Sequence, residues 1–229
     1  MNSPLHARIA AEFLGSTFLL AAVVGSGIMG ERLAGGNVAL ALLANSVATG
    51  AALVALILVF GSISGAHFNP LVTLVEAIQG RTAWRDVAAY MAAQIAGAFG
   101  GVAAAHLMFN LPIFFASRHA RNGFGLWCGE FVATLGLLLV IWGCSRARSS
   151  ATPFAVGAYI AAAYWFTSST SFANPAVTVA RAASDTFAGI RPADVPGFIG
   201  AQLAGTLVAT ILFHWLAPTR VDPKGERNS

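Results

Sequence analysis

The chain has 229 residues, of which 57% are hydrophobic and 10% are charged, and its formal net charge is +4. An average soluble domain carries roughly 25% charged residues, because its surface has to be solvated by water. This composition excludes an ordinary soluble protein and indicates a chain that lies in a lipid bilayer. The excess positive charge comes from arginines in the polar connections, so we expect no nucleic-acid partner.

Six long, largely apolar segments follow one another along the chain. They cover residues 10–29, 38–60, 87–109, 124–143, 153–166 and 196–217. A helix of about 20 residues crosses the hydrocarbon core, and a helix pairs all of its backbone groups within one segment. Two amphipathic segments, 69–79 and 174–183, are too short to cross. The sequence therefore predicts an all-α membrane protein with six transmembrane helices and two half-length helices, in a single domain over residues 1–229.

The two halves of the sequence repeat the same elements in the same order. The matched residues are Glu12 with Glu130, Asn69 with Asn174, Pro70 with Pro175, and Gln94 with Gln202. Each half, approximately residues 8–110 and 124–217, then holds three spans and one half-helix. Because three is an odd number, the second half must enter the membrane upside down. Such inverted repeats place functional elements near the bilayer midplane.

Each half-helix begins with an Asn-Pro pair, Asn69-Pro70 or Asn174-Pro175. Asparagine is a favoured N-cap, and proline fits the first turn of a helix. The inversion brings the two helix N-termini together at the membrane centre, where each carries a charge of roughly +0.5. Such a centre repels cations, while the asparagine amides donate hydrogen bonds to neutral molecules. The arrangement predicts a pore for small uncharged solutes.

The segment 64–70 and the triplet at 174–176 resemble the paired Asn-Pro-Ala signatures of aquaporins and aquaglyceroporins. The resemblance extends from residue 12 to about residue 216, and it implies the aquaporin fold, in which the two half-helices are re-entrant. The implied pore centre consists of Asn69, Pro70, Leu71, Asn174, Pro175 and Ala176. Leu71 departs from the family pattern, which usually has alanine at this position.

The resemblance also implies a selectivity filter nearer the outside of the membrane. Its four positions fall on Thr49, Ala162, Ser171 and Val177. Val177 stands where water and glycerol channels of the family have arginine, so we expect an uncharged and wide filter. The same feature resembles a bacterial branch associated with arsenic-resistance genes. The implied function is passive flux of glycerol-type solutes, neutral arsenic species and water.

The remaining site residues are also assigned by the resemblance. The carbonyl groups of Gly65, Ala66, His67, Thr170 and Phe172 are expected to line the pore. The side chains of Glu12, Glu130, Gln94 and Gln202 are expected to hold the segments that lead into the half-helices. Arg181 either replaces the missing filter charge or is a paired or solvated helix end.

Three further functions remain open from the sequence. Carboxylates inside a membrane often belong to proton relays, so Glu12 and Glu130 also fit an ion-coupled secondary transporter. A water-selective aquaporin and a structural membrane protein whose pore is closed are the other two alternatives. We find no nucleophile, phosphate-binding loop or metal cluster, and we expect no enzyme activity, no cofactor and no metal.

The distribution of positive charge predicts the orientation. With both termini on one side, that side holds eight of the 13 Lys and Arg residues and the other side holds five. The positive-inside rule then favours a multi-pass protein of the cell (inner) membrane with both termini in the cytoplasm. The family resemblance implies a homotetramer with one pore per subunit.

Overall fold

The computed structural model describes residues 3–216, in which the regular elements are helices. The long helices are α1 (Leu5–Leu33), α2 (Val38–Ser64), α4 (Trp84–Met108), α5 (Phe124–Ala147), α6 (Thr152–Phe166) and α8 (Val195–Leu216). The short helices are α3 (Pro70–Ile78) and α7 (Pro175–Arg181), and two 3-10 turns are η1 (Ser149–Ala151) and η2 (Pro192–Asp194). The order long, long, short, long occurs twice, which confirms the predicted fold class. Residue 217 of the last predicted span lies outside the described residues.

Five helical segments are long and apolar enough to cross a membrane; they are α1, α2, α4, α5 and the segment Pro192–Leu216, which contains α8. The remaining long helix, α6, has 15 residues, which corresponds to about 22 Å of helix. The 3-10 turn η1 directly precedes it, so the helical conformation begins at Ser149, before α6 itself.

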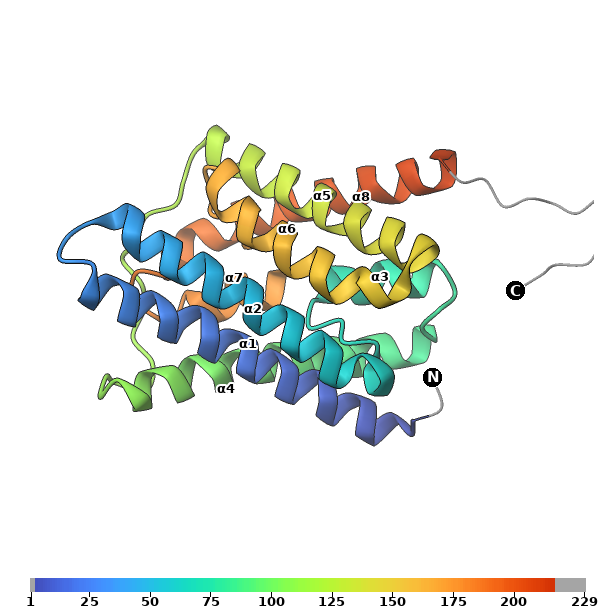
Figure 1. Ribbon diagram of the computed structural model, residues 1–229, viewed down its shortest axis with the longest axis horizontal. Coiled ribbons are helices and arrows are strands. Elements are labelled where there is room, and N and C mark those ends of the chain that lie inside the picture. Colours follow the sequence, from blue (N-terminus) through green and yellow to red (C-terminus); the bar gives the residue numbers. More distant parts are fainter. Residues whose placement is uncertain (1–2, 217–229) are drawn as a thin grey trace, which may run out of the picture.

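The long helices form one bundle around the two short ones (Figure 1). In the first half α1 packs against α2 and α4, and in the second half α5 packs against α6 and α8; α2 and α6 join the halves. The start of α1 and the end of α8 lie at the same end of the bundle, which we call the terminal end, and the opposite end is the distal end. The α3 helix lies in the terminal half and α7 in the distal half, so the two approach each other from opposite ends.

Glycines allow the equivalent helix pairs to approach closely. A Cβ atom at Gly97 of α4 would overlap the backbone oxygen of Phe13 on α1. In the second half, a Cβ at Gly205 of α8 would lie 2.6 Å from the backbone oxygen of Phe131 on α5. Small residues at helix crossings are typical of membrane bundles, where close backbone contact replaces hydrophobic burial as the source of stability.

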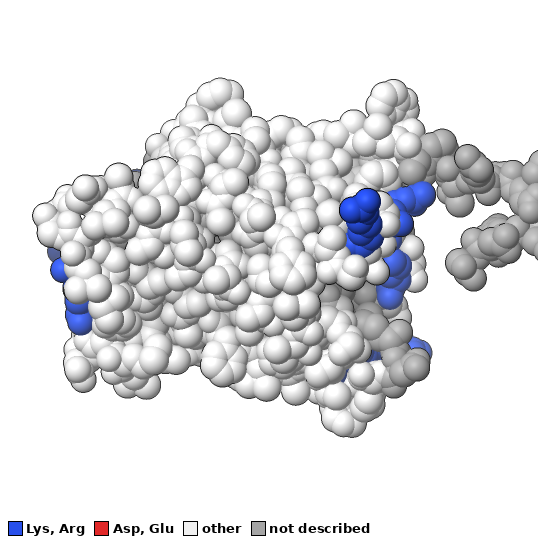
Figure 2. All heavy atoms as spheres, in the orientation of Figure 1, with Lys and Arg blue, Asp and Glu red and all other residues white. Residues whose placement is uncertain are grey.

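The outer surface of the bundle is apolar between its two ends. Exposed side chains on it include Phe18, Val47, Leu58, Phe154 and Leu207. On the face seen in Figure 2, lysine and arginine atoms appear only at the two ends, and the broad belt between them shows no charged residue. This belt matches the hydrocarbon region of a bilayer, and the five long apolar segments make the chain a multi-pass membrane protein.

Candidate functional site

The two half-helices begin at asparagine caps. The Oδ1 atom of Asn69 accepts a hydrogen bond from the N–H of Leu71 at 3.0 Å. The Oδ1 atom of Asn174 accepts from the N–H groups of Ala176 at 3.0 Å and Val177 at 3.3 Å. Both asparagines have extended backbone angles, as N-cap residues do, so the Asn-Pro pairs start helices for the reason that the sequence indicates.

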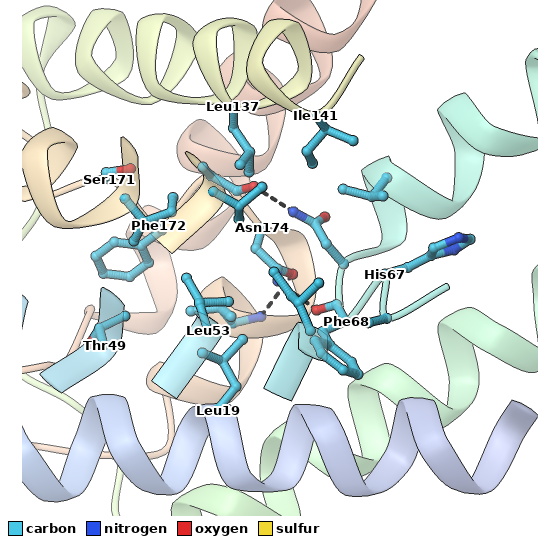
Figure 3. A pocket seen from close by; sticks show the side chains of 18 of the residues that line it. Leu19, Thr49, Leu53, His67, Phe68, Leu137, Ile141, Ser171, Phe172 and Asn174 are labelled. Atoms are coloured by element: carbon cyan, nitrogen blue, oxygen red, sulfur yellow. Dashed lines mark hydrogen bonds between the residues drawn. The ribbon is translucent and has the colours of Figure 1, made fainter. Parts of the chain in front are cut away.

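The two caps are also tied to each other's half of the chain. The Nδ2 atom of Asn69 donates to the carbonyl of Ala173 at 2.8 Å, and Nδ2 of Asn174 donates to the carbonyl of Phe68 at 2.8 Å (Figure 3). An amide group has two N–H donors. The reciprocal bonds use one on each side, and the second remains for a solute at the point where the helices meet.

The other predicted pore-centre residues stand behind the asparagines. Pro70 and Pro175 are the first residues of α3 and α7. Leu71 and Ala176 are buried in the packing around the helix starts. None of these four lines the central cavity, whereas Asn69 and Asn174 do. Leu71 therefore does not narrow the passage, although the family usually has a smaller residue there.

Residues 64–68 and 169–173, the lead-in segments, have strained backbones. Ala66, Phe68, Thr170, Ser171 and Ala173 all have positive φ angles between 48° and 63°. Such angles are unfavourable for residues other than glycine and persist only where neighbouring contacts enforce them. Something in the surrounding bundle must therefore hold both segments in place.

Glu12 supplies these contacts in the first half. Its Oε1 atom accepts from the N–H of His67 at 2.9 Å and from the Ser64 hydroxyl at 2.6 Å, and its Oε2 atom accepts from the N–H of Phe68 at 2.7 Å. Gln94 donates to the same carboxylate at 2.7 Å. Hydrogen bonds to a carboxylate are stronger than those between neutral groups, which suits a support for strained backbone.

Glu130 does the same in the second half. Its two oxygens accept from the N–H groups of Phe172 at 2.8 Å and Ala173 at 2.9 Å. Gln202 donates to Oε2 at 2.6 Å and to the hydroxyl of Thr178 at 2.9 Å. Both carboxylates are fully buried and neither lines the central cavity.

Two threonines belong to this support, and the sequence analysis assigned them no role. Gln94 donates to the hydroxyl of Thr73 at 2.8 Å, as Gln202 does to Thr178. Each threonine hydroxyl also donates to the carbonyl of its own cap asparagine four residues earlier. Their identical place in the two repeats is the signal that could have identified them.

A central cavity of about 460 Å³ runs past the two caps and is lined by both halves of the chain (Figure 3). Its apolar wall includes Leu19, Val23, Leu53, Leu137, Ile141, Val156 and Ile160. Its polar wall is formed mainly by the lead-in segments and by the asparagines. A passage with one apolar side and one hydrogen-bonding side can accommodate a solute that has both kinds of surface.

Four of the five residues predicted to offer carbonyls line this cavity, namely Gly65, Ala66, His67 and Phe172. The fifth, Thr170, does not. Its N–H donates to the carbonyl of Thr167 at 3.3 Å, so Thr170 belongs to the turn that ends α6. The pore-lining role of the Thr170 carbonyl stays a prediction.

Three of the four predicted filter residues, Thr49, Ser171 and Val177, line the cavity, but Ala162 does not. Ala162 is exposed on the outer face of α6, so its placement in the filter is wrong. Tyr164, two residues later, is buried and lines the cavity, with its hydroxyl 3.3 Å from the Thr49 hydroxyl. Two residues turn an α-helix by about 200°, which places Ala162 and Tyr164 on nearly opposite faces.

Arg181, the last residue of α7, is one of two arginines that line the cavity. It is 2% exposed, and its guanidinium carbon lies 3.4 Å from the ring centroid of Phe172. Its Nε atom donates to the carbonyl of Ala188. The other arginine, Arg81, lines the cavity together with Glu76 and pairs with its carboxylate, the Nε–Oε2 distance being 2.6 Å.

Comparisons with known proteins agree with this geometry. The sequence model of the major intrinsic protein family matches residues 2–167. Aquaglyceroporin AqpS of Rhizobium meliloti (strain 1021) is 54% identical over 212 residues, which are 93% of this chain and 91% of that protein. The chain belongs to the major intrinsic protein family. It is thus a membrane channel protein of the aquaporin and aquaglyceroporin superfamily, and not an enzyme.

More distant members of the family give the same result. Aquaporin NIP1-3 of rice (Oryza sativa subsp. japonica) is 35% identical over 179 residues, which are 75% of this chain and 62% of that protein. The X-ray structure of the aquaglyceroporin from Plasmodium falciparum superposes with a TM-score of 0.71 at 18% identity, covering 92% of this chain and 96% of that one. At this identity the superposition shows a shared fold.

Proposed function

We propose that this major intrinsic protein is a passive channel for small uncharged solutes, with a filter wide enough for glycerol-type solutes and neutral arsenic species as well as water. The name of its 54% identical relative, an aquaglyceroporin, supports glycerol-type solutes. The observation that carries the proposal is Val177, an apolar residue that lines the cavity three residues after Asn174. The side chain at this position therefore adds no guanidinium to the passage.

The hydroxyl groups around Val177 suit solutes with several oxygens. The Ser171 hydroxyl is buried, lines the cavity and has no hydrogen-bond partner among the described residues. The hydroxyls of Thr49 and Tyr164 contact each other across the junction of α2 and α6. A polyol passing through can bond to these groups while its CH groups contact Val177 and the apolar wall. A water-only filter would need a narrower and more fully charged ring.

Passive flux is favoured over ion coupling by the two intramembrane carboxylates. Glu12 and Glu130 are held by backbone and glutamine donors, and neither lines the cavity. A proton relay needs a carboxyl group that a proton can reach from the passage. These two carboxylates instead support the lead-in segments. Neither is on the cavity wall, where the relay residue of an ion-coupled transporter would have to be.

The filter proposal is tested by Val177→Arg in proteoliposomes, with Val177→Ile as the control for added volume without charge. Uptake of water, glycerol and a methylated arsenical is measured for each protein. We expect Val177→Arg to lower arsenical uptake by about tenfold or more while water flux changes little, because a guanidinium occupies space and favours small hydrogen-bonding solutes. Arsenical uptake equal to wild type would place the filter elsewhere, and an equal loss of all three solutes would indicate misfolding.

We also propose the topology and assembly that the sequence indicates. The terminal end of the bundle lies in the cytoplasm, the membrane is the inner membrane, and four subunits associate through their apolar outer faces. The distribution of Lys and Arg supports the orientation. Cross-linking in mild detergent tests the tetramer, and a product that stops at the dimer would contradict it.

A further inference from the structure

Arg181 is a buried cation without a carboxylate partner. Among the described residues, no Asp or Glu oxygen lies within 4.0 Å of its guanidinium, since none of the five ion pairs includes it. The side chain is anchored by one hydrogen bond, from Nε to the Ala188 carbonyl, and by the ring of Phe172. Its two terminal nitrogens make no hydrogen bond to the described residues. Burying an unpaired charge is costly, so an arginine at this position calls for a functional explanation.

A second buried arginine nearby shows what a purely structural role looks like. Arg121 also stands over the ring of Phe172, at 5.1 Å. Its three side-chain nitrogens all donate to carbonyls, those of Gly189, Ser169 and Phe187. Arg121 does not line the cavity, whereas Arg181 does. The comparison separates an arginine that holds loops together from one whose donors remain available to the passage.

The position of Arg181 relates it directly to the filter. Val177 and Arg181 are four residues apart on α7 and therefore share one face of this helix. Since α7 begins at the pore centre, the Cα atom of Arg181 lies one turn further toward the distal end, about 6 Å beyond that of Val177. The carboxylate that lines the same cavity, Glu76, is paired with Arg81 at the far end of the passage. No carboxylate among the described lining residues therefore neutralises Arg181.

We propose that Arg181 supplies the charge of this channel's filter, one helical turn outside the level of Val177. Its terminal N–H groups donate to the oxygens of entering neutral solutes, and its positive charge excludes small cations before they reach the asparagines. This proposal rests on the proposed function of a wide channel for uncharged solutes. It separates the two tasks of a filter, because Val177 leaves the cross-section open while Arg181 provides the electrostatic barrier.

The test compares urea with guanidinium, two planar molecules of nearly equal size that differ in charge. Wild type and Arg181→Met are reconstituted in liposomes, and the uptake of both solutes is measured. We expect wild type to pass urea and exclude guanidinium. In Arg181→Met, guanidinium uptake should rise by about tenfold, because the repulsion that lowers the local cation concentration is gone, while urea uptake should not rise, because urea carries no charge and loses the Arg181 donors.

Three further variants make the result decisive. Arg181→Gln, which is neutral but can still donate to Ala188, replaces the methionine variant if that protein fails to fold. Arg181→Lys keeps the charge and should keep guanidinium excluded. Arg118→Met removes a charge from the same end of the molecule, where the Arg118 side chain is exposed and does not line the cavity, and it should behave as wild type.

The outcomes distinguish this proposal from the function on which it rests. Guanidinium uptake that remains at the wild-type level in both neutral variants, or a wild type that already passes guanidinium, would overturn the assignment of Arg181. A wild type that passes neither urea nor glycerol would instead overturn the proposed channel function. Entry of guanidinium into Arg118→Met would show a general surface-charge effect and would also count against Arg181.

Discussion

At the scale of single residues, we propose that the filter divides two properties, width and charge, between two side chains of α7. Val177 gives an apolar wall at the level of the filter, and Arg181 carries the charge one turn away on the same helix face. Ser171 lies at the same level with a buried hydroxyl that has no partner among the described residues. In this proposal these side chains, rather than the helices that carry them, set which solutes the channel accepts.

Ser171 makes the accessibility of the filter directly measurable. The described cysteines, Cys128 and Cys144, do not line the central cavity, so we expect mercuric ion to leave glycerol flux through wild type unchanged. In Ser171→Cys a thiol replaces a hydroxyl on the cavity wall, and mercuric ion should block the flux. Adding a thiol reductant should then restore it. Strong block of the wild-type protein would mean that a native cysteine reaches the passage, and a Ser171→Cys protein that mercuric ion does not block would mean that Ser171 is not at the narrow part of the passage.

The sequence specifies the supporting residues of the site better than its wall. The carboxylates and glutamines can be assigned because each appears twice, at equivalent places of the repeat. Ala162 is misplaced because its position is counted from the Asn-Pro-Ala motifs through the turn after α6. The length and path of that turn decide which face of α6 meets the pore, and no periodicity in the sequence records them. Tyr164 escapes prediction for the same reason.

At the scale of elements, the two lead-in segments are the part of the fold that most needs support. Five of their residues have left-handed backbone angles, which are held by N–H groups that donate to Glu12 and Glu130. The matching bonds in both halves mean that the inverted repeat is preserved at the level of single hydrogen bonds. The start of each half-helix is consequently held twice, by the carboxylate that bonds the residues just before the cap and by the asparagine cap itself.

Replacing one carboxylate should therefore destabilise the whole domain. Glu130→Gln turns one acceptor oxygen into an NH₂ group that faces a backbone N–H. We expect the free energy of unfolding to fall by about 2 kcal/mol, the worth of a hydrogen bond to a charged group. Denaturant unfolding in detergent micelles measures this loss. The exposed Glu31 offers a matched control, since Glu31→Gln should leave stability unchanged, and equal stability of both variants would refute the supporting role of Glu130.

At the scale of the whole molecule, the six long helices and two half-helices create a passage lined by both repeats. The number, type and order of these elements follow from the apolar segments and the Asn-Pro pairs, because membrane thickness and backbone hydrogen bonding leave few other solutions. The detailed fit does not follow in the same way. Contacts such as Gly97 against Phe13 depend on where two helices cross, which hydropathy alone does not determine.

The central claim, that the whole molecule conducts uncharged solutes passively, is tested most directly by glycerol flux in proteoliposomes that carry no ion gradient. We predict that the liposomes swell in a glycerol gradient faster than protein-free ones and that the rate rises linearly with the gradient. A protonophore should leave the rate unchanged, because Glu12 and Glu130 do not line the cavity and Glu76, which does, is paired with Arg81. Swelling no faster than in protein-free liposomes, or glycerol uptake that the protonophore abolishes, would contradict the account.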